Sequence, residues 1–181
     1  METFMAAPFN PPADAIALDG LARAWAHIER ATRAGRDDRE ARLNLMSASM
    51  QGAMAFQKGL GCVHSLSHSL GGIDPRLHHG TLNAMFLPAV IAFNGEAESV
   101  RKDQRLQRMA QAMHLDSAAD LGPAIRDMNA RLGLPKGLAE MGVAPGMFEG
   151  IIDGAMADHC HKTNPRLASR EDYRAMLEAS M

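Results

Sequence analysis

The sequence predicts an all-α protein with a single domain over residues 1–181. Three observations carry this prediction. Methionine (14 residues), alanine and leucine are abundant, and all three favour helices. Aromatic residues make up only 4% of the chain, and β-branched runs typical of strands are rare. Apolar residues recur at helical spacing between Pro, Asp and Gly punctuation, which indicates seven or eight helices.

The first expected helix follows Pro12 and stops at Gly35, a residue type that often ends helices. Leu21, Trp25 and Ile28 repeat at helical spacing along it. We therefore expect this apolar face to belong to the core.

A second helix is expected from Asp37-Asp38 to about Lys58. Its apolar residues fall on one broad face, and methionine stripes usually serve as adaptable core packing. The sequence therefore predicts a buried face made of Leu43, Met46, Met50, Ala53 and Met54.

The next segment predicts a short helix over 62–70, a glycine-containing loop over 71–75 and an apolar helix over 80–94. Pro88 lies inside this apolar helix and is expected to kink it or to start a new turn. Further helices are expected over 96–113, 117–133 and 145–160. A last helix should start at Ser169 with a capping-box pattern.

The net charge of −2 and a pI of about 6.4 give the chain no electrostatic reason to bind nucleic acid or an anionic membrane. No stretch of about 18 apolar residues occurs, so no membrane span is expected. Two cysteines cannot form a disulfide framework, and the amino-terminal residues do not resemble a secretory signal. A cytoplasmic location is the expectation.

Histidines offer the main chemical signal. His64 and His68 are four residues apart, so both rings project from one helix face, and His79 follows after a loop that can turn back. Three converging imidazoles suit a divalent transition metal. The bland alternative is that this His-x-x-x-His pair only makes ordinary hydrogen bonds.

The segments GLGCVHSLSHSLGG, HHG, TLNAMFLP and IAFN, with NPPADAIALDGL, AFQKGLG, LGLP and NPR around them, occur in the chain in a specific order. This combination resembles the iron-containing (group III) alcohol dehydrogenase family over essentially the whole chain. The resemblance implies the helical carboxy-terminal domain of such enzymes, with a fold like that of dehydroquinate synthase.

The resemblance also implies roles for individual residues. His64 and His79 correspond to metal ligands, and His68 would lie beside the nicotinamide and substrate and help move the alcohol proton. His79 is preferred to His78 because it directly precedes Gly80, although an exchange between the two remains open. The run His159-Cys160-His161 is expected to serve packing or surface roles, since neighbouring side chains on a helix diverge.

The resemblance further implies Fe(II), with Zn(II) as second choice, and NAD(P) in the complete enzyme only. We expect the nucleotide-binding domain, and an Asp and a His ligand just upstream of Glu2-Thr3-Phe4, to be missing. The isolated chain should then be inactive and should pair with that missing domain or subunit, or form a homo-oligomer. The alternative is a non-catalytic helical binding or assembly module derived from the family. The sequence identifies neither the substrate alcohol nor which of the two cofactors, NAD or NADP, is used.

Overall fold

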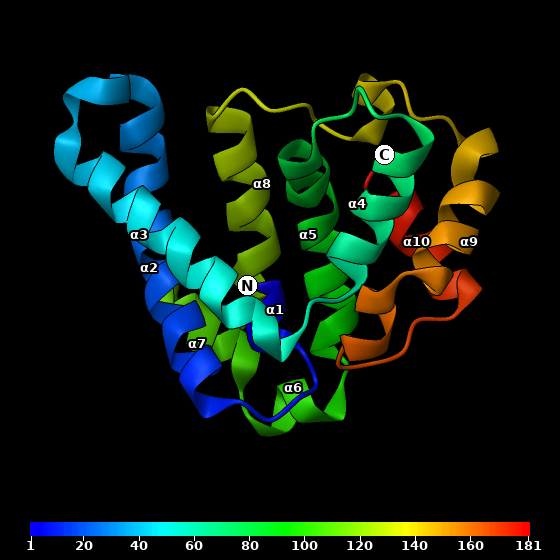
Figure 1. Cartoon of the computed structure of the whole chain (residues 1–181), viewed down its shortest axis with the longest axis horizontal. Coiled ribbons are helices and arrows are strands. Elements are labelled where there is room, and N and C mark those ends of the chain that lie inside the picture. Colours follow the sequence, from blue (N-terminus) through cyan, green and yellow to red (C-terminus); the bar gives the residue numbers. More distant parts are fainter.

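The computed structural model describes residues 1–181 and contains helices and turns but no strand, which confirms the predicted all-α class (Figure 1). The α-helices are α1 (Glu2–Met5), α2 (Pro11–Ala34), α3 (Arg39–Ala55), α4 (Cys62–Ile73), α5 (His79–Gly95), α6 (Glu98–Lys102), α7 (Arg105–Ala112), α8 (Leu121–Arg131), α9 (Phe148–Ala157) and α10 (Arg170–Ala179). Short 3₁₀ turns are η1 (Gly35–Asp37), η2 (Phe56–Lys58), η3 (Ala118–Asp120), η4 (Leu138–Met141), η5 (Pro145–Met147) and η6 (His159–Thr163). No helix combines the length and the apolar character needed to cross a lipid bilayer.

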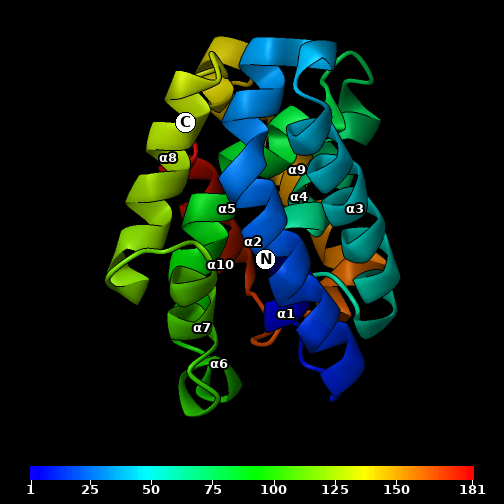
Figure 2. The same ribbon diagram turned by 90° about the vertical axis from the view of Figure 1, so that its left-hand side faces the viewer.

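The helices form two packed groups that share α5. In Figure 1, α2 and α3 make a hairpin on one side, and α4, α9 and α10 stand on the other. Helix α5 runs between them and contacts α4, α8 and α10. Figure 2, turned by 90°, shows α2 lying in front of α5, with α6, α7 and α8 along one edge.

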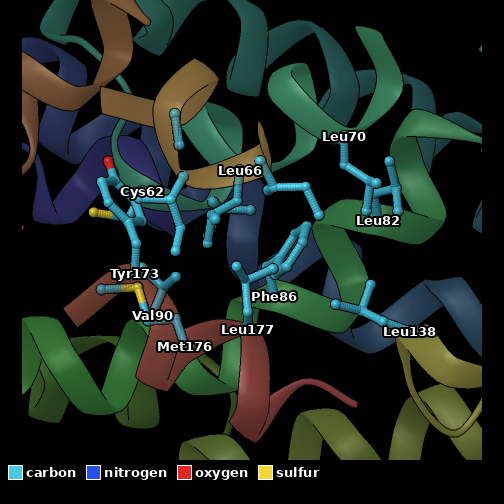
Figure 3. Packing of buried hydrophobic residues seen from close by; sticks show 14 of the residues in the cluster. Cys62, Leu66, Leu70, Leu82, Phe86, Val90, Leu138, Tyr173, Met176 and Leu177 are labelled. Atoms are coloured by element: carbon cyan, nitrogen blue, oxygen red, sulfur yellow. The ribbon is translucent and has the colours of Figure 1, made fainter. Parts of the chain in front are cut away.

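The group around α4 and α5 buries large apolar side chains, some of which are drawn in Figure 3. Leu66, Phe86 and Tyr173 are fully buried, and each comes from a different helix. We call this set the large core. Its members are Cys62, Val63, Leu66, Leu70, Leu82, Met85, Phe86, Val90, Leu138, Val143, Phe148, Ile151, Ile152, Ala155, Ala168, Tyr173, Met176 and Leu177.

Helix α5 continues through Pro88 without breaking into two helices. Proline has no N–H, so the carbonyl of Ala84, four residues earlier, loses its partner within the helix. The buried Asn129 of α8 supplies the replacement, because its Nδ2 donates a hydrogen bond to Ala84 O at 3.1 Å. The proline therefore does not leave the Ala84 carbonyl unpaired, and the hydrogen bond from Asn129 links α8 to α5.

The prediction that the methionine-rich face of α3 belongs to the core is wrong. Helix α3 meets α2 through small residues, and its buried positions are Ala41, Ala48 and Ala55. This close approach turns the long side chains outward. The Met-rich face is therefore exposed, with 69% exposure for Leu43, 69% for Met46, 60% for Met50 and 49% for Met54, and Ala53 is exposed beside them.

Helix α2 ends at Ala34, before Gly35, as expected, but it begins at Pro11, so that Pro11 and Pro12 lie in its first turn and Asn10 is its N-cap. Its predicted core face is only half-buried, since Leu21, Trp25 and Ile28 line an apolar cavity of about 280 Å³. The hairpin is thus less tightly filled than the large core.

Two other boundaries differ from the expectation. Helix α4 continues through Gly71-Gly72 to Ile73, where a loop was expected, and the Ile73 side chain lies near Gly150 of α9. The expected helix over 96–113 breaks at Gln104, whose φ of 49° is left-handed. The capping box at Ser169 is confirmed, because Ser169 and Asp172 bond each other's backbone amides.

Candidate metal centre and the family of the chain

The structure brings the three predicted histidines together. His64 and His68 project from one face of α4, and His79 opens α5 opposite them. Their ring centroids are 5.6 Å apart for His64 and His68, and 5.4 Å apart for each of the other two pairs. The loop between the two helices therefore turns back as the spacing predicts.

This triangle has the dimensions of a metal site. Imidazole nitrogens lie about 2.1 Å from a bound transition metal, so tetrahedral ligands place their ring centroids roughly 5 Å apart. Neutral imidazole is also the form that binds. Burial, and secondarily the neighbouring His64 and His68, hold the pKa of His79 below its usual value, which favours that neutral form.

His64 has a carboxylate partner from the other end of the sequence. Its Nδ1 is hydrogen-bonded to Glu2 Oε2, and the Glu2 side chain is buried. A carboxylate on Nδ1 keeps the proton there and leaves Nε2 as the acceptor nitrogen. His64 thus keeps one nitrogen available as a ligand atom, in a ring that lies beside the other two.

His68 is held by a different carboxylate. Its Nδ1 lies 3.0 Å from Asp158 Oδ2, while Asp158 Oδ1 accepts the Cys160 amide at 2.7 Å. Partial burial opposes ionisation of Asp158, but the hydrogen bonds from the Cys160 amide and His68 outweigh it and lower its pKa. His68 is therefore oriented by an ionised group.

His68, Asp158 and Cys160 also place one possible ligand atom each within 4.8 Å of the others. Burial raises the pKa of the Cys160 thiol to about 12, so the thiolate that would bind a metal is disfavoured. Both Asp158 oxygens already accept hydrogen bonds. The cluster is thus accounted for as a hydrogen-bonded support for His68.

His78 and His79 have separate positions. His78 caps α5, because its Nδ1 accepts the Thr81 amide at 3.3 Å, whereas His79 joins the triangle. Asn83 Nδ2 lies 3.1 Å from His79 Nε2, and the buried Asn83 Oδ1 has no partner. With the carboxamide turned over, Oδ1 would accept a hydrogen bond from His79 Nε2–H and leave Nδ1 free.

The residues of the expected packing run are spread over different surroundings. Cys160 is buried, His161 Nδ1 lies 2.9 Å from Tyr173 Oη, and His159 is exposed, with its ring stacked at 6.1 Å from His68. The run thus packs against the site, and it brings in Asp158, which the sequence did not single out.

The asparagines of IAFN and NPR hold the loop that carries Asp158. Asn94 and Asn164 are buried and bond each other through both carboxamides, at 2.7 and 3.1 Å. Asn164 Oδ1 also accepts the Cys62 amide at 3.2 Å, at the start of α4. These motif residues therefore fix the position of α4, the helix that carries His64 and His68, and have a structural role.

Comparison with known proteins decides the family. The model for the C-terminal part of the Fe-containing alcohol dehydrogenase family matches residues 1–181. The chain belongs to this family. Membership implies a divalent metal and NAD(P) as the family's cofactors.

Individual relatives agree with this membership. The chain is 65% identical over 185 residues to the 4-hydroxybutyrate dehydrogenase of Cupriavidus necator, covering 100% of the chain and 48% of the relative. It is 32% identical over 190 residues to the NAD-dependent methanol dehydrogenase of Bacillus methanolicus, again covering 100% and 48%. A crystal structure of 1,3-propanediol oxidoreductase superposes with a TM-score of 0.90 at 27% identity, over 99% of this chain and 48% of that one. The chain thus spans about half the length of these relatives.

Proposed function

We propose that residues 1–181 form the helical metal-binding domain of an NAD(P)-dependent iron-type alcohol dehydrogenase, which interconverts an alcohol and an aldehyde. The observation that carries the proposal is the convergence of His64, His68 and His79, in a chain whose whole length matches the family. NAD(P) and the nucleotide-binding half belong to the complete enzyme.

In this proposal His64 and His79 hold the metal, with Fe(II) preferred and Zn(II) as the second choice. When bound, the ion supplies Lewis-acid chemistry at the alcohol oxygen. His68 is assigned to proton transfer because the family resemblance places the corresponding histidine beside the nicotinamide and the substrate. Its side chain is 35% exposed and is therefore open to a substrate. With Asp158 on its Nδ1, His68 would receive the alcohol proton at Nε2. NAD(P)⁺, when bound, would supply the hydride acceptor.

Two imidazoles provide no charge to balance a divalent ion, and Fe(II) prefers a carboxylate among its ligands. We therefore propose that a nucleotide-binding partner domain or subunit contributes the remaining ligands together with the cofactor site. The isolated chain should then bind metal weakly and should not oxidise alcohols.

The relative from Cupriavidus necator suggests a substrate class. At 65% identity over the whole chain, it supports a hydroxy acid of the 4-hydroxybutyrate type as the alcohol. A reducing cytoplasm is also proposed, because Cys62 and Cys160 are both free and buried.

A chimera tests the proposed function. The carboxy-terminal half of the Cupriavidus necator enzyme is replaced by this chain, and reduction of NAD⁺ by 4-hydroxybutyrate is followed at 340 nm. We expect turnover by the chimera, its loss in the His64→Ala and His79→Ala forms, and none from the chain alone. Robust turnover by the pure 181-residue chain would contradict the proposal.

The second candidate is a non-catalytic helical binding or assembly module. The exposed Met-rich face of α3 favours it, since contiguous exposed apolar surface often marks a contact site. A chimera that folds and binds NAD(P) but shows no turnover would favour this module over the enzyme.

A further inference from the structure

We propose that Glu2 is the positioning residue for His64: it holds the proton on Nδ1 and aims Nε2 at the metal. The proposal rests on the metal site put forward above. It assigns a functional role to α1, a single helical turn far from α4 in the sequence.

The contacts of Glu2 are divided between ring and backbone. Oε2 accepts the hydrogen bond from His64 Nδ1, while Oε1 accepts the Val63 amide at 2.6 Å and the His64 amide at 3.4 Å. The Glu2 side chain is only 6% exposed. The same carboxylate therefore caps α4 and orients the ring, so the ring cannot turn independently of its helix.

Gly61 provides the space for this arrangement. A Cβ at Gly61 would lie 3.1 Å from Glu2 Oε1 and would collide with Asn164 Oδ1. The backbone at Gly61 is extended, so the need for glycine there is purely steric. A glycine directly before α4 thus lets a carboxylate reach the first amides of the helix.

A buried set of charges anchors α1 at the required place. Lys58 Nζ donates to Phe4 O at 2.9 Å, Arg105 Nη1 donates to the same carbonyl, and both cations pair with Asp14. The Lys58 side chain is fully buried. Two cations from different helices therefore fix the backbone two residues beyond Glu2.

The chemical consequence concerns the ligand nitrogen. A carboxylate on one imidazole nitrogen fixes the tautomer and raises the basicity of the other, and its loss typically costs about 10- to 100-fold in metal affinity. His68 has such a partner in Asp158, but His68 is assigned to proton transfer. The two carboxylates should therefore affect metal binding to different extents.

Titration of the full 181-residue chain with Co(II), followed by visible absorption, tests the proposal. Glu2→Gln should lower Co(II) affinity about 10- to 100-fold, and Glu2→Asp, which keeps the charge, should retain part of it. Glu178→Gln, at an exposed acid on α10, is the matched control and should leave affinity unchanged. Far-UV circular dichroism checks that each variant keeps its helices.

Two further variants separate this proposal from the proposed function. If His64→Ala lowers Co(II) affinity and Glu2→Gln does not, the role of Glu2 is overturned while the metal site stands. If Cys160→Ser lowers affinity and His64→Ala does not, the ion binds beside Asp158 and both are overturned.

Imidazole ¹⁵N NMR of the metal-free chain gives a readout that a purely structural role would not move. We expect the His64 proton on Nδ1 in the unaltered chain. Glu2→Gln should give mixed tautomers, because an amide can donate as well as accept. A His64 proton on Nε2 in the unaltered chain would overturn the proposal.

Discussion

The large core and the α2–α3 hairpin are built from similar residues but bury them differently. The large core closes around Leu66, Phe86 and Tyr173, which are fully buried. The hairpin closes around alanines, exposes its long side chains and borders an apolar cavity of about 280 Å³. Helix composition alone thus does not tell which side chains hold a helix in place.

The difference follows from how closely the helices approach. Small residues let two backbones come near each other, and there is then no room for methionine between them. In the large core the space between the helices is filled by Leu, Phe and Met. Stability should therefore depend on large side chains in one region and on small ones in the other.

The largest expected effect lies in the large core. Phe86→Ala removes a fully buried ring and should lower the free energy of unfolding by about 3–5 kcal/mol. Urea denaturation followed by circular dichroism measures it. A decrease in the free energy of unfolding of less than about 1 kcal/mol would mean that the large core collapses into the space left by the Phe86 ring.

Next comes the seam between the two groups, at Asn129. Asn129→Ala leaves the Ala84 carbonyl without a partner and should cost about 1–3 kcal/mol. In a Pro88→Ala background the helix can satisfy that carbonyl itself, so the same change should cost less. Equal costs in both backgrounds, in a double-mutant denaturation cycle, would show that the hydrogen bond does not serve this purpose.

In the hairpin, enlarging a small residue should be harmful. Ala41 is fully buried, and Ala41→Leu should force the helices apart at a cost of about 1–2 kcal/mol. Leu43→Ala, on the exposed face of the same helix, is the matched control. If the two variants have equal stability by denaturation, the close approach of α2 and α3 is not what holds the hairpin.

The smallest effect on stability is expected on the Met-rich face. Met46→Gln with Met50→Gln should change the free energy of unfolding by less than about 0.5 kcal/mol, because both side chains are exposed. The pair should nevertheless weaken self-association, which sedimentation over a wide concentration range would measure. A chain that is already monomeric at high concentration contradicts the expected homo-oligomer.

Local signals in the sequence predicted much of the fold. Pro11 and Gly35 bracket α2, and Ser169 starts α10 through its own capping box. The four-residue spacing of His64 and His68 correctly predicted that both rings lie on one helix face, because residues four apart in an α-helix are neighbours on its surface. These features need no knowledge of distant parts of the chain.

Features set by distant contacts were not predictable in this way. Glu2 reaches His64 across 62 residues, and Asp158 reaches His68 across 90. The outward turn of Met46 depends on how closely α2 approaches, which periodicity does not encode. Likewise, Gly71-Gly72 remains helical although two successive glycines predict a loop, and α4 packs along α9.

The hydrogen bond from Asn129 to the Ala84 carbonyl has an evolutionary consequence. Proline at position 88 removes the helical donor for the Ala84 carbonyl, and Asn129 of another helix provides a replacement donor. Replacement of Asn129 alone would leave a defect in the helix that begins with His79, whereas prior loss of the proline would make Asn129 dispensable. Among relatives we therefore expect positions 88 and 129 to vary together, with the proline abandoned before or along with its donor.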